Sequence, residues 1–204
     1  TLFRSWSLHD IGALKLQQLP DAEDLDDGTK EVVKKNTQET LDRYGDLDEE
    51  VLRLITQMQE LYTRESDAEI PAGLKESVNA NILYVADAYD RMTAMKSFEE
   101  PTSEVKAVRE LLADEERYNK KIVNALIHGI SILYPGVCVE LSNGEKGLVI
   151  TENEENILEP IVLDFRNNNL YDLSDPSVKQ TVEIADVMKT MDNRIKLDKS
   201  LLEE

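Results

Sequence analysis

The sequence NANILYVADAYDRMTAMKS (residues 79–97) is the stretch around which the rest of the chain can be arranged. Its apolar residues recur every three and four positions, which predicts a helix from Asn79 with one buried face. The residues expected on that face are Ile82, Val85, Ala86, Tyr89 and Met92. Asp87 and Asp90, three residues apart, share a strip beside it. Burying an aspartate is costly unless it is paired, hydrogen-bonded or metal-bound, so Asp87 is either a satisfied structural residue or a metal ligand.

The composition limits the partners that the chain can bind. Its 204 residues suffice for one domain, or one domain with a small appendage, and its formal net charge is −19. A field of this sign repels phosphate backbones and anionic lipid, so we expect neither nucleic-acid nor membrane binding. No apolar run approaches the ~20 residues of a membrane span. The single cysteine, Cys138, excludes an internal disulfide and fits a reducing compartment, so we expect a cytoplasmic location.

A second polar feature lies in the apolar opening of the chain. Residues 2–14 predict a helix that ends near Pro20, and because the chain starts without methionine in mid-helix, we expect the native protein to begin upstream. The helix contains Ser7-Leu8-His9-Asp10-Ile11-Gly12. An adjacent His-Asp pair on an apolar helix needs polar company, so it is either a satisfied core pair or part of a metal site. The acidic residues 21–28 lack the glycine and terminal glutamate of a helix–loop–helix calcium site and are interpreted as a solvated loop.

Four more helices are predicted from caps and apolar spacing, over residues 29–44, 48–62, 103–113 and 118–133. We expect Thr29 to cap the first of them, with inward side chains from Val32, Val33, Leu41 and Tyr44. Residues 63–75 are polar and predict a loop over the mouth of any site. His128 stands alone on its helix and is interpreted as a surface or capping residue.

After Tyr134 the apolar period changes from helical to alternating. Strands are predicted over residues 137–141, 147–150, 160–165 and 170–173, with Asn143-Gly144 as the turn of a hairpin. So small a sheet is not stable alone and should pack on the helices. The residues from Pro176 are ambiguous between strand and helix, and a charged tail follows.

These segments together resemble the HD-GYP family, bacterial HD-superfamily hydrolases of cyclic di-GMP. SLHDIG (residues 7–12) is similar to the family pattern LHDIGK, and ILYVADAYDRMT (residues 82–93) is similar to ILAVADVYDALTS. YPGVCVELSNGEKGLVI with EPIVLDF resembles the small β extension that follows many HD-GYP helical domains. The resemblance implies a mainly α fold. An HD-type helical bundle would occupy residues 1–133, truncated on its N-terminal side, and a small antiparallel β appendage with a tail would occupy residues 134–204.

The resemblance also identifies candidate metal ligands. In the family, two or three metal ions held by His and Asp activate the water that attacks the phosphodiester. His9 and Asp10 match the HD pair, and Asp87 matches the later metal aspartate. Three expected histidines are replaced by residues that do not substitute for imidazole around iron or manganese in a hydrolytic centre: Asn36, Met58 and Gln59.

Other departures concern phosphate binding. The lysine that follows HDIG in the family is Ala13 here, and the GYP loop is absent in register, with only a displaced echo at residues 70–75. The family segment that holds phosphate corresponds to residues 94–99, which lack both arginines.

The resemblance therefore implies a catalytically degenerate HD-GYP-like domain without a cofactor. It would be a regulatory or scaffold module of bacterial signalling that contacts a protein partner, an upstream regulatory domain or a second copy of itself. The alternative is a divergent metal-dependent phosphohydrolase, a cyclic dinucleotide phosphodiesterase with iron or manganese at a reduced site of His9, Asp10, Asp87 and Glu60. A nucleotide sensor without turnover is a third option, disfavoured by the missing basic residues.

Overall fold

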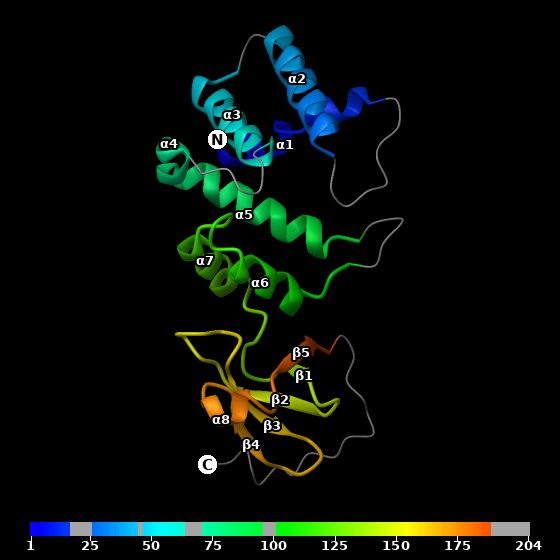
Figure 1. Ribbon diagram of the computed structural model, residues 1–204, viewed down its shortest axis with the longest axis vertical. Helices are drawn as coiled ribbons and strands as arrows, with labels where there is room; N and C mark the ends of the chain where they lie inside the picture. Colours follow the sequence, from blue (N-terminus) through cyan, green and yellow to red (C-terminus); the bar gives the residue numbers. More distant parts are fainter. Residues whose placement is uncertain (17–25, 45–46, 64–70, 96–100, 189–204) are drawn as a thin grey trace. The chain divides into compact units, whose positions relative to one another are not determined.

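The computed structural model describes residues 1–16, 26–44, 47–63, 71–95 and 101–188 (Figure 1). Its contacts divide the chain into two compact units. The helical unit is Thr1–Glu100 with Asp114–Val123, and the sheet unit is Pro101–Ala113 with Asn124–Glu204. This division differs from the expected boundary after residue 133, because it assigns two helical segments that precede that residue to the sheet unit.

The helical unit is built from short to medium helices, coloured blue to green in Figure 1. They are α1 (Leu2–Leu8), the 3-10 helix η1 (Ile11–Lys15), α2 (Asp27–Tyr44), α3 (Glu49–Thr63), α4 (Ala72–Glu76) and α5 (Val78–Thr93). Helix α1 contacts α3 and α5, α2 packs on η1 and α3, and α5 also packs on α3 and α4. Helix α3 contacts α1, α2 and α5 and therefore lies at the centre of the unit.

Helix α2 begins two residues earlier than predicted. Asp26 caps it, because its carboxylate accepts the Thr29 backbone N–H at 2.9 Å and the Thr29 hydroxyl at 2.7 Å. The inward residues are Val33, Thr37 and Leu41, so the expected burial of Val32 and Tyr44 was wrong: these side chains are exposed. Helices α3 and η1 cover only one narrow stripe of α2, so only the residues on that stripe are buried.

Helix α5 confirms the predicted helix from Asn79 and, of its predicted buried face, Val85, which is 1% exposed. Ile82, predicted on that face, is 38% exposed, whereas Tyr84, Asp87 and Ala88, which were not predicted on it, are buried. Because α5 has neighbours in α1, α3 and α4, its buried surface is wider than one apolar stripe and includes Asp87 itself. Helix α4 also replaces part of the loop that was predicted over residues 63–75.

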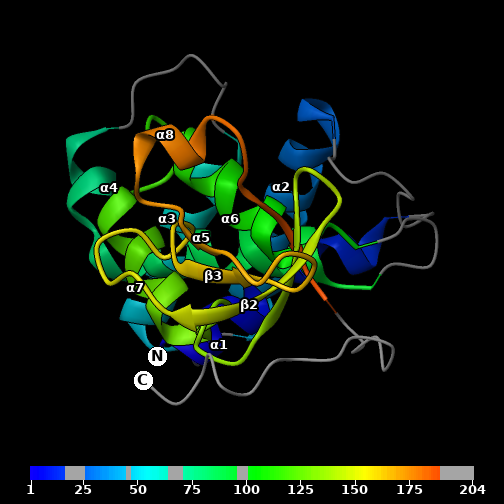
Figure 2. The same cartoon turned by 90° about the horizontal axis from the view of Figure 1, so that it is seen from below.

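The sheet unit contains a five-stranded antiparallel sheet in the order β4-β3-β2-β1-β5. The strands are β1 (Cys138–Leu141), β2 (Lys146–Thr151), β3 (Ile161–Asp164), β4 (Leu170–Asp172) and β5 (Ile184–Val187). Figure 2 shows β2 and β3 side by side. The predicted hairpin is confirmed: Gly144 adopts φ 81°, and its N–H donates to the Leu141 carbonyl at 2.8 Å.

The ambiguous segment after Pro176 contains both kinds of structure. It forms the short helix α8 (Pro176–Lys179), capped by Asp175, and then the edge strand β5. Helix α6 (Glu104–Ala113) packs beside β5. Arg109 joins them, because its Nη2 donates to the Ile184 carbonyl at 2.5 Å and lies 3.1 Å from a Glu183 carboxylate oxygen.

The predicted fold class, a mainly α HD-type bundle with a small β appendage, is wrong. Helices take up 55% of the described residues and a five-stranded sheet 13%, so the fold is mixed. The sheet is no appendage, because a fifth strand and α6 give it a core of its own. Its buried residues include Val139, Leu141, Val149, Val162, Leu163 and Ile184.

Several predicted features lie outside the described residues. They are most of the acidic loop at 21–28, most of the segment at 94–99, Ile70 and the charged tail. Helix α7 (Lys120–Ile130) is described, and His128 is exposed on it as expected. Within the described ranges no helix is long and apolar enough to cross a membrane.

Candidate functional site

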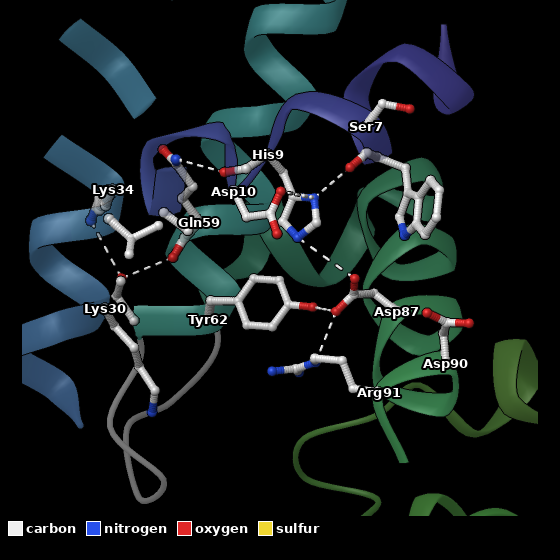
Figure 3. Close-up of a pocket in the computed structure, with 14 residues that line it drawn as sticks. Ser7, His9, Asp10, Lys30, Lys34, Gln59, Tyr62, Asp87, Asp90 and Arg91 are labelled. Atoms are coloured by element: carbon white, nitrogen blue, oxygen red, sulfur yellow. Dashed lines mark hydrogen bonds and ion pairs between the residues drawn. The ribbon is translucent and has the colours of Figure 1, made fainter. Parts of the chain in front are cut away.

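The candidate site is a cavity of about 530 Å³ in the helical unit (Figure 3). Its walls come from α1, the turn into η1, α2, α3 and α5. A volume of this size falls within the roughly 300–1,000 Å³ range of small-molecule sites. The cavity contains all three candidate ligands, His9, Asp10 and Asp87.

His9 is held in place by one hydrogen bond from its ring and another to its backbone carbonyl. It follows the last residue of α1, and its Nδ1 lies 2.6 Å from the Trp6 carbonyl oxygen, to which it donates. The His9 carbonyl in turn accepts Gln59 Nε2 from α3 at 3.0 Å. With Nδ1 engaged, Nε2 is the ring atom that points into the cavity.

The turn after His9 is packed closely against α2. The Gly12 N–H donates to Thr37 Oγ1 at 3.0 Å, and a β-carbon on Gly12 would lie 2.3 Å from the Val33 carbonyl oxygen. Only glycine fits such an approach of two backbones. The glycine of the HDIG pattern therefore fixes the distance between α2 and the His9 turn.

Asp87 faces His9 across the cavity. His9 Nε2 lies 3.6 Å from Asp87 Oδ1, and both side chains are 9% exposed. The other carboxylate oxygen, Oδ2, accepts the Tyr62 hydroxyl and lies 3.0 Å from Arg91 Nε. Asp87 is thus contacted from three elements, and a guanidinium lies against it as counter-charge.

Tyr62 and Arg91 form the remainder of this polar cluster. The Arg91 guanidinium carbon lies 4.6 Å from the centre of the Tyr62 ring, a cation–π contact, and the His9 ring stacks on Tyr62 at 5.6 Å. Tyr62 also meets Tyr84 edge to face at 5.2 Å. We call His9, Tyr62, Asp87 and Arg91 the Asp87 cluster.

The electrostatic state of Asp87 reflects burial and compensation. Desolvation raises the pKa of Asp87 above its ordinary value of 3.8, while the charges of Arg91 and His9 lower it and that of Asp10 raises it further. A side-chain hydrogen bond from Trp6 also lowers the pKa. Burial is the largest of these causes, so the surroundings of Asp87 on balance disfavour its charged form.

Asp10 is less tightly held than its neighbours. Its side chain is 65% exposed, and Oδ1 lies 3.9 Å from His9 Nδ1, an atom already bonded to the Trp6 carbonyl. Asp10 therefore contributes a solvent-facing charge to the cavity and not a fixed contact with the Asp87 cluster.

The residues at the expected histidine positions are dispersed. Met58 is fully buried in the core and does not line the cavity. The Asn36 side-chain amide donates to the Gly12 carbonyl at 3.4 Å, and the Gln59 side-chain amide donates to the His9 carbonyl. Glu60, a ligand in the hydrolase alternative, is exposed and lies outside the cavity lining.

This arrangement does not fit a two- or three-metal hydrolytic centre. Among the described residues, no group of three or more His, Cys, Asp and Glu side chains is placed to hold a metal ion. Arg91 lies against Asp87 Oδ2, where such a centre would have a cation. The donor set of His9 and Asp87, with Asp10 facing solvent, is too small for that chemistry.

Two members of the Asp87 cluster were not predicted from the sequence. Arg91 lies four residues after Asp87, a spacing that places opposite charges together on a helix, so the sequence did contain a signal for it. Tyr62 had no such signal, because its contact with Asp87 depends on how α3 packs against α5.

Comparisons of the chain with protein-family models, curated proteins and solved structures gave no match.

Proposed function

We propose that the helical unit is an HD-GYP-like domain that has lost hydrolase activity and acts as a regulatory or scaffold module. The single observation that carries the proposal is the state of Asp87, whose carboxylate is bound by Tyr62 and paired with Arg91. A metal ion at that oxygen would have to displace the guanidinium. In this reading the HD-type residues now stabilise the packing of α1, α3 and α5.

The wider properties of the module follow from the same reading. The charge of −19 disfavours nucleic acid and anionic lipid as partners, so we expect contacts with a protein partner, an upstream regulatory domain or a second copy of the chain. The absence of disulfide-forming cysteine pairs favours the cytoplasm. A role in bacterial cyclic di-GMP signalling rests on the sequence resemblance alone.

Elemental analysis tests the proposal directly. The protein is expressed with iron and manganese supplied, purified without chelator and assayed for both metals, alongside a His9→Ala variant. We expect no stoichiometric metal in either folded protein, and no hydrolysis of cyclic di-GMP. One equivalent or more of metal that disappears in the His9→Ala variant would overturn the proposal in favour of the reduced-site phosphohydrolase.

A further inference from the structure

Four aromatic rings lie in consecutive contact inside the helical unit. They belong to His9, Tyr62, Tyr84 and Tyr118, and we call them the ring ladder. The ring centres of successive members are 5.6, 5.2 and 5.4 Å apart, stacked in the outer two pairs and edge to face in the middle pair. These are the preferred arrangements of aromatic pairs, whose centres lie roughly 4.5–7 Å apart. Each ring therefore packs on the next as an attractive pair.

The two ends of the ring ladder lie in different parts of the helical unit. His9 and Tyr62 line the cavity (Figure 3), whereas Tyr118 does not. Tyr118 belongs to the turn between α6 and α7, residues 114–119, and its backbone N–H donates to the Asp114 carbonyl at 2.9 Å. This turn leads directly into α7, along which the chain passes from the helical unit to the sheet unit. The ring ladder thus joins the cavity to the start of that helix.

Two arginines hold the rings in place. The Arg91 guanidinium carbon lies 4.6 Å from the centre of the Tyr62 ring, and that of Arg117 lies 5.6 Å from the centre of the Tyr118 ring. Arg117 Nε also donates to the Tyr84 hydroxyl at 2.8 Å. Cation–π contacts and a charge-assisted hydrogen bond therefore add to the ring contacts, and Arg117 joins the last two rings.

The half of the ring ladder that lies away from the cavity is buried. Tyr84 is 1% exposed and Tyr118 is 6% exposed. Burial raises the pKa of Tyr118 to about 12, so its hydroxyl stays protonated at neutral pH. Protein interiors are close-packed, with few voids into which a large ring could move. A displacement of one ring therefore requires its neighbour to move as well.

We propose that the ring ladder is a regulatory device that couples the cavity to the turn before α7. An event in the cavity that repositions the His9 ring, such as the binding of an effector, would shift Tyr62 and through it the two buried rings. Contiguous packed side chains are one physical means by which two sites exchange free energy. Sites that lie apart and share no partner have additive effects on stability, so coupling between the first and last rings is not expected from core packing in general. The inference rests on the proposed function, since the ring ladder would serve a regulatory module.

A double-mutant cycle between the two ends tests the inference. Urea unfolding of the full chain is followed by the fluorescence of Trp6, the only tryptophan, which lies in the helical unit. We expect His9→Ala and Tyr118→Leu each to raise the unfolding equilibrium constant. In the double variant the rise should be at least about threefold smaller than the product of the two single effects, because independent sites are additive to within about twofold. A smaller departure from the product would overturn the inference.

Two control variants separate the ring ladder from general destabilisation. Val33→Ala truncates a buried side chain that lines the same cavity outside the ring ladder, so its effect should be additive with that of Tyr118→Leu. Tyr62→Leu removes an intermediate ring, and in this background the coupling between His9→Ala and Tyr118→Leu should disappear. Equal coupling of Val33→Ala and His9→Ala to Tyr118→Leu, or coupling that persists without the Tyr62 ring, would contradict the proposed device.

Hydrogen exchange provides the measurement if the double variant does not fold. The Tyr118 backbone N–H reports on the turn through its bond to Asp114. We expect His9→Ala to accelerate exchange of this N–H at least about threefold more than Val33→Ala does. A smaller difference would refute the coupling. Metal content, measured separately, decides the proposed function, so a protein with neither metal nor coupling would refute the ring ladder alone.

Discussion

Arg91 Nε lies 3.0 Å from Asp87 Oδ2, one helical turn away on α5. The contact is an ion pair without hydrogen-bond alignment, since within the described residues this buried nitrogen has no hydrogen-bond partner. It places a fixed organic cation beside the carboxylate that the HD-GYP resemblance implies as a metal ligand.

Replacing Asp87 by alanine should lower the free energy of unfolding by about 1–3 kcal/mol, because the Tyr62 hydroxyl and the Arg91 guanidinium lose their partner. Urea denaturation measures the change. The control is Asp90→Ala on the same helix, which is exposed and should change stability by no more than about 0.5 kcal/mol. Equal losses in the two variants would show that the Asp87 cluster does not stabilise the fold.

The pH dependence of stability should carry the signature of Asp87. Because burial raises the pKa of Asp87 above 3.8, the folded protein binds more protons than the unfolded chain between the two pKa values. Its contribution to stability is fully present below the unfolded pKa and is lost as the pH rises through the folded pKa. Asp87→Asn should flatten this part of the curve of unfolding free energy against pH, measured by urea denaturation from about pH 4 upward. A variant with the wild-type slope would contradict the assignment.

Gly12→Ala should destabilise the protein by about 1–3 kcal/mol or prevent the close approach of η1 to α2, because the added carbon would lie 2.3 Å from the Val33 carbonyl oxygen and 2.4 Å from the Thr37 nitrogen. Gly129→Ala is the matched control. A β-carbon there meets nothing within 4 Å, and alanine should stabilise α7 by up to about 1 kcal/mol. Thermal unfolding of both variants gives the comparison, and a neutral Gly12→Ala would refute the packing argument.

Ile184→Ala should cost about 2–5 kcal/mol if the fifth strand completes the core of the sheet unit, since Ile184 is fully buried. Leu170→Ala, at the opposite edge of the sheet, removes a side chain that is 63% exposed and should have little effect. Chemical denaturation followed by circular dichroism distinguishes the two. If Ile184→Ala lowered the free energy of unfolding only slightly, the fifth strand would not be part of the core of the sheet unit.

Local patterns predicted much of the secondary structure, and long-range packing decided the rest. The Asn143-Gly144 hairpin and the helix from Asn79 follow from residue spacing, and both are present. The buried face of α5 did not follow, because three neighbouring helices cover more of its surface than one apolar stripe can indicate. The fold class was wrong for a similar reason, since the pairing of α6 with β5 joins segments far apart in the chain.

The candidate site was predictable to the extent that its residues share a local pattern. The HDIG turn and Asp87 stand out because charged residues on apolar helices need partners, and the structure brings His9 and Asp87 within 3.6 Å. Whether they hold a metal ion is a separate question that elemental analysis answers. Tyr62 could not be predicted, because its role depends on tertiary contact between α3 and α5.

The bond between Arg109 and the Ile184 carbonyl spans 75 residues of the chain. Proteins are synthesised from the N-terminus, so α6 leaves the ribosome well before the strand that it packs against. Until β5 arrives, β1 presents an unpaired strand edge, a template for association with other chains. Ribosome stalling or premature termination before residue 184 would therefore leave a sheet open at one side, and such nascent chains should depend on chaperones more than the finished protein does.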